Sequence, residues 1–378
     1  MIAELTGAAI GVFVVFNVVA LSVLVLVLLE RKFLARLQQR FGPMRVGPHG
    51  ILQTAADALK LLLKEDFTPA TADRWLFQLA PLFVIIPIFL PFVTIPFARD
   101  LVVRNLELGV LYVLAVPVLS ALGFFLAGWA SDNKYALLGA VRYAAVLVSY
   151  ELPMLIGVIG VVMVTGTLDL VAIVEQQAVW PLVFAQLPAF LLFLVGGLAE
   201  GNRTPFDIAI AESEIVGGPF VEYSGMRWSL FYLAEYASIF ATAALTTLLF
   251  LGGWNGPVLP PVVWFLIKTY AVIIVIFWLR GTMPRLRIDQ LMNLAWKGLI
   301  PFAFLNLLVT GVAVLAGGPG PGSPLVILGG LGTTAVSLAA LTLALRSQRR
   351  SDVRVGTSAR FGDDLANRPP AAGHYSVP

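Results

Sequence analysis

The sequence predicts an all-α integral membrane protein with about nine transmembrane helices. Hydrophobic residues fill 59% of its 378 positions, charged residues fill only 12%, and long apolar stretches recur along the chain. A soluble globular domain has about 25% charged residues, and about twenty apolar residues cross a bilayer. The chain is therefore predicted to be a polytopic membrane protein, and no nucleic acid partner is expected.

Nine apolar segments are long enough to be spans. They lie near residues 9–30, 76–98, 109–129, 142–165, 180–199, 229–252, 261–280, 299–316 and 325–345. The first has no basic segment before it and no small-residue cleavage site, so we expect a retained span and not a signal peptide. The Gly- and Pro-rich turn at 317–322 separates the last two spans.

The distribution of basic residues predicts the orientation of the spans. With the N-terminus outside, the external loops contain only Arg99 and Arg104, and Lys268 lies within a span. All other basic residues are then cytoplasmic or at the cytoplasmic membrane edge. Residues 1–345 form one predicted membrane domain with cytoplasmic loops at 31–75, 130–142, 200–228 and 281–298. The basic tail, 346–378, is predicted to be disordered in the cytoplasm.

Some of the cytoplasmic loops are predicted to be folded. Residues 51–65 place their leucines broadly on one face and their charges elsewhere, which favours an amphipathic helix lying in the membrane interface. Residues 204–216 begin with Thr204 as N-cap, Pro205 at N1 and Asp207 at N3, which predicts a helix that Gly217 ends.

The chain carries no residues for its own redox centre. It has no cysteine and only two histidines, His49 and His374, which are far apart in the sequence. Disulfides, iron–sulfur ligation and an ordinary metal site are therefore not expected. Any electron carrier that serves this protein must lie on another subunit or on a diffusible molecule.

Two carboxylates lie inside predicted spans. Glu151 is about nine residues into the fourth span and Glu235 about six residues into the sixth. Carboxyl groups at membrane depth are costly, so they mark function by default. We favour a proton relay, because a carboxyl group at such depth can load and release a proton; the alternative is a structural hydrogen bond between helices.

The acids between these two spans have competing interpretations. Asp207 is either a helix cap or a functional residue, and it would share a helical face with Glu214 but not with Glu212. Glu200, at the end of the fifth span, is expected to pair with Arg203 three residues later.

The first cytoplasmic loop combines cations with two Gly-Pro steps. The positive-inside bias alone explains Lys32 and Arg36. The Gly-Pro steps, however, indicate a fixed loop, which would form the wall of a lateral opening through which an amphiphile enters from the lipid. Glu30 and Arg31 would then form a charged floor.

Long motifs carry a family resemblance. The segments LLERKFLARLQQRFGPMRVGPHGILQTAADALKLLLKED, SYELP, AEGNRTPFD, ESEIVGG, VEYSG and AEY occur in order between about residues 20 and 300. They resemble the membrane-embedded H subunit of bacterial respiratory complex I, the family of mitochondrial NADH dehydrogenase subunit 1. The eighth and ninth spans match in hydropathy only.

The resemblance implies a subunit of a proton-translocating NADH:quinone oxidoreductase in the bacterial inner membrane. It implies a cavity for a quinone such as ubiquinone, which this chain encloses together with hydrophilic subunits. It also implies adjacent membrane subunits as partners, and FMN and iron–sulfur clusters that are bound by partner subunits. By resemblance to the family motifs, two sets of residues in this chain are assigned roles. The quinone cavity set is Glu30, Arg31, Arg40, Asp57, Glu200, Arg203 and Asp207, and the proton relay set is Glu151, Glu212, Glu214, Glu222 and Glu235.

The chain departs from the family pattern at two places. Ala209 and Ile210 stand where Pro and Glu are common, so one relay acid is missing, and Pro219-Phe220 replaces an aromatic residue followed by a polar one. Two alternatives remain open: the homologous subunit of a membrane-bound hydrogenase or of a dehydrogenase with another donor, and a stand-alone proton channel or secondary transporter. The absence of an internal repeat and the folded loops argue against the second alternative.

Overall fold

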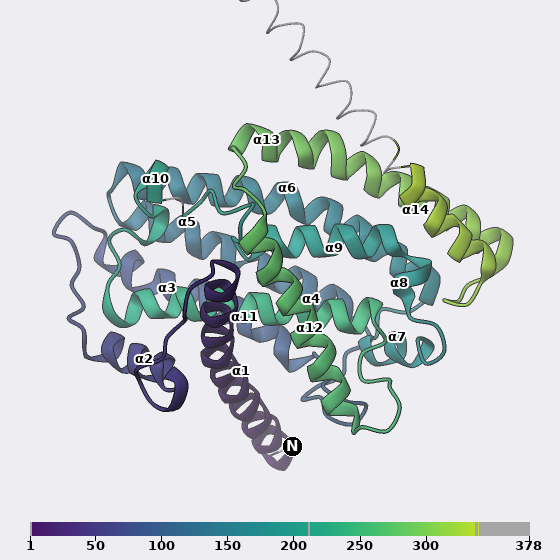
Figure 1. Cartoon of the computed structure of the whole chain (residues 1–378), viewed down its shortest axis with the longest axis horizontal. Helices are drawn as coiled ribbons and strands as arrows, with labels where there is room; N and C mark the ends of the chain where they lie inside the picture. The colour runs from purple at the N-terminus through teal and green to yellow at the C-terminus, as the bar shows by residue number, and fades with distance from the viewer. Residues whose placement is uncertain (1, 211, 337–338, 340–378) are drawn as a thin grey trace, which may run out of the picture. The chain divides into compact units, whose positions relative to one another are not determined.

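The described chain is built from helices, as predicted. The computed structural model describes residues 2–210, 212–336 and 339; the side chains of residues 2–5, 8, 212 and 213, and the predicted tail, lie outside this description. The α-helices (Figure 1) are α1 (Ile2–Leu37), α2 (Gln53–Leu63), α3 (Arg74–Phe89), α4 (Gly109–Val118), α5 (Ser120–Ala130), α6 (Lys134–Thr165), α7 (Leu170–Gln176), α8 (Leu182–Ala185), α9 (Leu187–Glu200), α10 (Glu212–Ile215), α11 (Gly225–Phe250), α12 (Pro261–Thr282), α13 (Ile288–Asn293) and α14 (Ile300–Gly317).

Seven of the nine predicted spans coincide with helices that could cross a membrane, and the other two coincide with shorter helices. Within the described residues, seven helical segments are long and apolar enough to cross a membrane, and two shorter apolar helices lie at the fifth and ninth predicted spans, Leu187–Glu200 and Pro324–Val336. The seven are Ala9–Leu37, Arg74–Val93, Gly109–Ala130, Lys134–Thr165, Gly225–Phe250, Pro261–Thr282 and Ile288–Gly317. The last of them includes a π-helical turn, Leu294–Leu299, between α13 and α14.

Two predicted spans are interrupted for local reasons. The third consists of α4 and α5, which meet at Leu119, two residues after Pro117. The fifth begins as the short α8, breaks at Gln186, and continues as α9 with Pro188 in its first turn. A proline lacks the backbone N–H of an interior helical residue, so these breaks are expected at the prolines. The break leaves α9 only 14 residues long, with Glu200 as its last residue.

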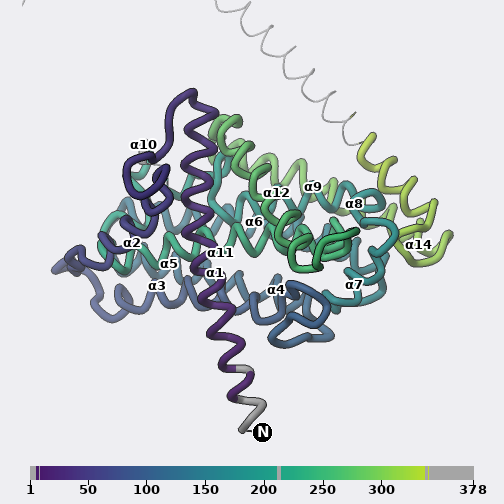
Figure 2. The backbone as a smooth tube through the Cα atoms, turned by 60° about the horizontal axis from the view of Figure 1, so that its bottom comes forward, coloured from purple at the N-terminus to yellow at the C-terminus, as the bar shows by residue number. Residues whose placement is uncertain are grey.

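Helix α11 is the centre of the fold. It is buried along almost its whole length, and it packs against α3, α9 and α12. Helix α6 packs against α5, α9 and α14. Helix α1 crosses α11 at a steep angle, and α12 lies beside α1 (Figures 1 and 2). The end of α1 is thereby brought to the start of α11, although some 190 residues of sequence separate them.

The loop between α1 and α3 is folded, as the Gly-Pro steps predicted. Gly50 has a φ of +77°, and a Cβ at that position would lie 2.1 Å from the carbonyl oxygen of Pro43, so only glycine fits. At the other end of the loop, Arg227 of α11 contacts Asp66 at 2.9 Å. Helix α2 forms within the loop and exposes Leu59, as expected for an interfacial helix.

The predicted helix at 204–216 is wrong: only Glu212–Ile215 is helical there. The capping signals are local, whereas the segment is held by tertiary packing. Phe206, Ile208 and Ala209 are all buried, which an amphipathic helix at the surface would not achieve. The carbonyl of Pro205 also accepts a hydrogen bond from the Leu286 N–H at 3.2 Å. The segment is therefore an irregular chain packed into the core.

Candidate functional site

A large cavity lies where α1, α11 and α12 meet the loops that follow α1 and α9. Its volume is about 1380 Å³. It is lined by Glu30, Arg31, Leu34, Gln38, Arg40, Pro43, Gln53, Asn202, Arg203, Asp207, Ile210, Val216, Gly217, Phe220, Val221, Trp228, Phe231, Tyr232, Glu235, Tyr236, Arg280 and Arg285. Five of the seven residues of the predicted quinone cavity set are among them, so the structure brings together residues that are up to 177 positions apart.

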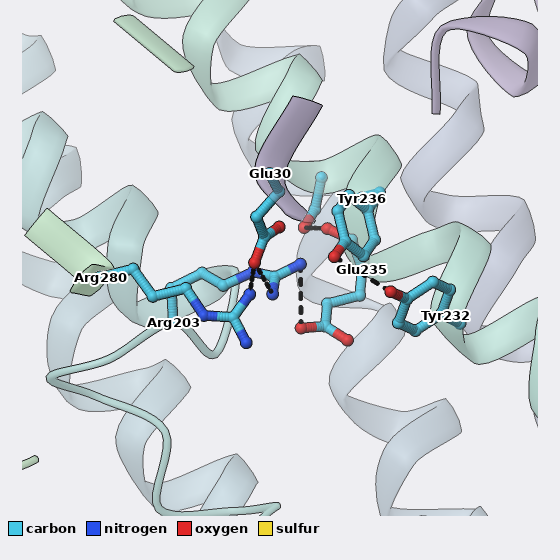
Figure 3. Close-up of polar contacts among 7 residues, drawn as sticks. Glu30, Arg203, Tyr232, Glu235, Tyr236 and Arg280 are labelled. Atoms are coloured by element: carbon cyan, nitrogen blue, oxygen red, sulfur yellow. Dashed lines mark hydrogen bonds and ion pairs between the residues drawn. The ribbon is translucent and has the colours of Figure 1, made fainter. Parts of the chain in front are cut away.

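The inner part of the cavity holds a buried ion cluster (Figure 3). One carboxylate oxygen of Glu30 lies 3.5 Å from Nη1 of Arg203 and also contacts Arg280. Glu30 and Arg203 are each only 3% exposed. A buried charge is tolerated when it is paired, and here each member comes from a different element: α1, the loop after α9, and α12.

Glu235 extends this cluster on the α11 side. Its carboxylate lies 3.3 Å from Nη2 of Arg203, whose guanidinium also stacks over the ring of Tyr236 at 4.4 Å. The hydroxyl of Tyr232 donates to the hydroxyl of Tyr236 at 3.1 Å. Trp228 stacks on Tyr232 one turn earlier in α11. An aromatic ladder at i, i+4 and i+8 therefore leads along the cavity wall to the ion cluster.

The electrostatics of Arg203 favour its charged form. Burial acts to lower the pKa of Arg203, but the carboxylate of Glu235 and the neighbouring Tyr236 outweigh it, so the pKa lies above its ordinary value. Nε of Arg203 and Oε2 of Glu30 are buried without a hydrogen-bond partner within the described structure. Unpaired buried polar atoms are rare and costly, so a donor and an acceptor are available here to a bound molecule.

A more exposed set of charges surrounds the rest of the cavity. Arg31 pairs with Asp57 at 2.5 Å, and Gln53 donates to the same carboxylate at 3.1 Å. Asp207 pairs with Arg285 at 2.9 Å. Each acid that lines the cavity thus has an arginine partner.

A second, smaller cavity holds two of the predicted residues and contains no basic side chain. Glu151 of α6 and Glu200 of α9 line it together with apolar residues and Thr242 of α11. Its volume is about 30 Å³, room for one water molecule. Neither carboxylate forms an ion pair with any described residue. The predicted pairing of Glu200 with Arg203 is wrong, because Arg203 turns to Glu30 and Glu235 instead.

The remaining predicted acids are held apart from both cavities. Glu214 pairs with Arg142 of α6 at 2.7 Å, and Glu222 accepts a hydrogen bond from Asn133 at 2.7 Å. The side chain of Glu212 lies outside the described part of the chain. Asp207 is not a helix cap, because no helix begins beside it. Asp207 and Glu214 therefore do not lie on one helix, and the predicted common helical face is wrong.

Arg280, Arg285, Tyr232 and Tyr236 line the cavity but were not predicted. The positive-inside bias alone explains why Arg280 and Arg285 occur on the cytoplasmic side. The position of Arg280 at the end of an apolar span could nevertheless have indicated a buried acidic partner, which is Glu30. The tyrosines lie four residues apart beside Glu235, and this spacing could have placed them on one face with it. Among the described residues, no group of three or more His, Asp or Glu side chains is arranged to hold a metal ion.

A family model described as NADH dehydrogenase matches residues 10–311. The chain belongs to this family. The match confirms the resemblance to the H subunit of respiratory complex I, and it extends into the eighth span, further than the motifs did.

Several bacterial members of the NADH dehydrogenase family are similar over most of their length. The NADH-quinone oxidoreductase H subunit of Dehalococcoides mccartyi is 49% identical over 303 residues, 80% of this chain and 86% of that protein. The second such H subunit of Geobacter sulfurreducens is 50% identical, covering 79% of this chain and 93% of its own. The corresponding protein of a Geobacillus species is 51% identical, covering 75% and 87%.

Proposed function

We propose that this chain is the membrane subunit of a proton-translocating NADH:quinone oxidoreductase and that its large cavity binds the quinone. The observation that carries the proposal is the spare donor on Arg203 and the spare acceptor on Glu30, both buried against a cavity of about 1380 Å³. A quinone carbonyl can accept from the first, and a quinol hydroxyl can donate to the second. The names of the relatives support the choice of quinone and NADH.

The cavity offers a polar end and an apolar wall, as a quinone with an isoprenoid tail requires. Arg203, Glu30 and Arg280 supply the polar end. Ile210, Val221 and other apolar residues supply the wall. Binding energy of a long apolar tail scales with buried area, so the wall adds affinity while the charges orient the head group.

In this proposal the chain supplies no electrons of its own. Quinone reduction takes two electrons and two protons, and FMN and iron–sulfur clusters on hydrophilic partner subunits deliver the electrons. The hydrophilic subunits would complete the cavity above the loops, and further membrane subunits would lie against the lipid-facing helices. The chain contributes the head-group site, the local field and the proton connection.

We also propose that the carboxylates form the start of the proton path. Glu235 faces the cavity, whereas Glu151 and Glu200 share the small pocket deeper in the protein. Glu214 and Glu222, held by Arg142 and Asn133, would relay protons only after leaving those partners, and Glu212 remains an expectation from its motif.

The positive-inside bias supports an orientation in the inner membrane with the N-terminus outside and the cavity loops in the cytoplasm. The domain limits, 1–345 with the tail 346–378, belong to the same proposal.

Isolation of the tagged chain in mild detergent tests the proposal. We expect it to co-purify with iron–sulfur and flavin-containing partners, and we expect its deletion to abolish membrane NADH:quinone reductase activity. A chain that purifies alone, and whose deletion leaves that activity unchanged, would contradict the proposal.

A further inference from the structure

A third cavity lies at the opposite end of α12 from the large cavity. Helix α12 begins beside it at Pro261 and reaches the large cavity at Arg280. The volume of the third cavity is about 510 Å³, and the loops after α7 and α11 form most of its wall. With the orientation that the positive-inside bias predicts, this cavity lies at the outer face of the membrane.

Lys268 is the only ionisable side chain that lines the third cavity. It lies seven residues after Pro261 in α12, which is about 10 Å along a helix that rises about 1.5 Å per residue. Its Nζ donates to the carbonyl oxygens of Leu251 and Asn255, at 2.8 and 2.7 Å. An ammonium group has three donor hydrogens, so the third is left for a molecule in the cavity.

The charge of Lys268 is not balanced by a carboxylate. No acid among the described residues forms an ion pair with it, whereas Arg99, also on the outer side, pairs with Glu175 at 2.9 Å. Leu251 is the C-cap of α11, so the dipole of that helix offsets part of the charge. The remainder is a positive charge within a membrane span, which is costly without an anionic partner.

The rim of the third cavity is apolar and exposed. Val179 lines the cavity and is 81% exposed, and Val258, which follows the lining residue Pro257, is fully exposed. The indole of Trp264 donates to the carbonyl of Pro257 at 2.8 Å, and tryptophan is enriched where a membrane meets water. A molecule that fits here presents an anion to Lys268 and apolar chains to the rim.

We infer that the third cavity binds the phosphate group of an anionic phospholipid from the outer leaflet. A phosphate oxygen accepts the third hydrogen of the Lys268 ammonium, and the acyl chains lie against Val179 and Val258. A free phosphate ion would satisfy the ammonium but would leave the apolar rim uncovered. The inference rests on the proposed membrane orientation and not on quinone binding.

Two substitutions remove the attraction for an anion by different routes. Lys268→Met deletes the charge together with the contacts to the α11 end. Ala178→Glu keeps those contacts and places a carboxylate in the same cavity, at a position that is exposed and therefore tolerates a longer side chain. Ala178→Gln is its control, with the same shape and no charge. Arg104→Met, which removes an outer-side cation that does not line the cavity, is the control for Lys268→Met.

Photolabelling of the assembled complex in proteoliposomes measures the binding. The probe is a phosphatidylglycerol with a photoreactive group, and the readout is its yield on residues 177–181 and 251–257. We expect Lys268→Met and Ala178→Glu each to lower this yield about fivefold, the effect of one cation near an anionic lipid. Ala178→Gln and Arg104→Met should label like wild type. A photoreactive diacylglycerol, which has no phosphate, should label all variants equally.

Three results would overturn the inference. The first is wild-type labelling in Ala178→Glu, which decides the matter even if Lys268→Met fails to assemble. The second is an equal loss in Ala178→Gln, which would make shape and not charge the cause. The third is complete displacement of the lipid probe from wild type by excess inorganic phosphate, which would identify a site for a soluble anion. NADH:quinone reductase activity of the same wild-type preparation tests the proposed function separately.

Discussion

The carboxylates of the two cavities differ in their neighbours. In the large cavity Glu30, Glu235 and Asp207 each face an arginine, whereas in the small pocket Glu151 and Glu200 face apolar side chains and one threonine. A cation beside a carboxylate stabilises its charge, while two unpaired carboxylates in one apolar pocket repel each other until one binds a proton. The first arrangement suits binding and orientation, and the second suits proton exchange.

Among the substitutions that test this difference between the two cavities, replacing Arg203 should have the largest effect. Arg203→Met leaves Glu30 and Glu235 buried without their shared partner, and breaking a buried pair costs about 3–5 kcal/mol. We expect quinone reductase activity to fall at least about a hundredfold and assembly to weaken, measured as activity per assembled complex and as yield on native gels.

Arg227→Met is the control for Arg203→Met. It removes an arginine from another ion pair, with Asp66, which does not line the cavity. Its activity per assembled complex should stay within about twofold of wild type, because neither partner lines the cavity and the pair, with 21% and 29% of its side chains exposed, is still reached by solvent. Equal losses in the two variants would show that the buried cluster has no special role.

Substitutions in the small pocket should lower turnover without changing quinone binding, unlike substitutions in the large cavity. Glu151→Gln and Glu200→Gln keep the shape of the side chain and remove proton exchange, so we expect coupled turnover to fall about tenfold or more while the quinone KM stays constant. Turnover and KM are measured together with proton pumping in proteoliposomes. Glu175→Gln is a matched control, because Glu175 pairs with exposed Arg99 and lines neither cavity. A raised KM with normal pumping would place the two acids in quinone binding instead.

The contrast also explains which parts of the structure the sequence could predict. Spans follow from hydropathy, and Glu151 and Glu235 could be singled out because charge at membrane depth is costly. The partners of Arg203 could not be found, because Glu30 is 173 residues away and Glu200, three residues away, is the simpler choice. The capping signals at Thr204 and Asp207 are valid locally, but burial of the intervening chain overrides them.

Charges at the outer part of the large cavity should have smaller effects. Arg31 and Asp57 pair with 42% and 33% of their side chains exposed, so solvent screens the interaction. We expect Arg31→Ala or Asp57→Asn to change quinone KM or the potency of quinone-site inhibitors roughly two- to fivefold. Lys60→Ala on the same α2 helix is the control. Unchanged KM and potency in both pair variants would remove this pair from the cavity wall.

The smallest expected effect tests whether the large cavity tolerates an acid without a cation. Ile210 lines the cavity at the position where the family resemblance led us to expect Glu, and it packs partly against the core. We expect Ile210→Glu to raise the KM for a long-tailed quinone about threefold, because the apolar wall loses contact area at about 0.8 kcal/mol per CH₂. Ile210→Gln, which has the same shape without charge, should raise it equally. The proton-to-electron ratio should not change in either variant, because Glu235 already supplies the acid on the cavity side. A higher ratio in Ile210→Glu alone would mean that the missing acid limits coupling, and the division between a binding cavity and a proton pocket would then be less sharp than the two sets of carboxylates indicate.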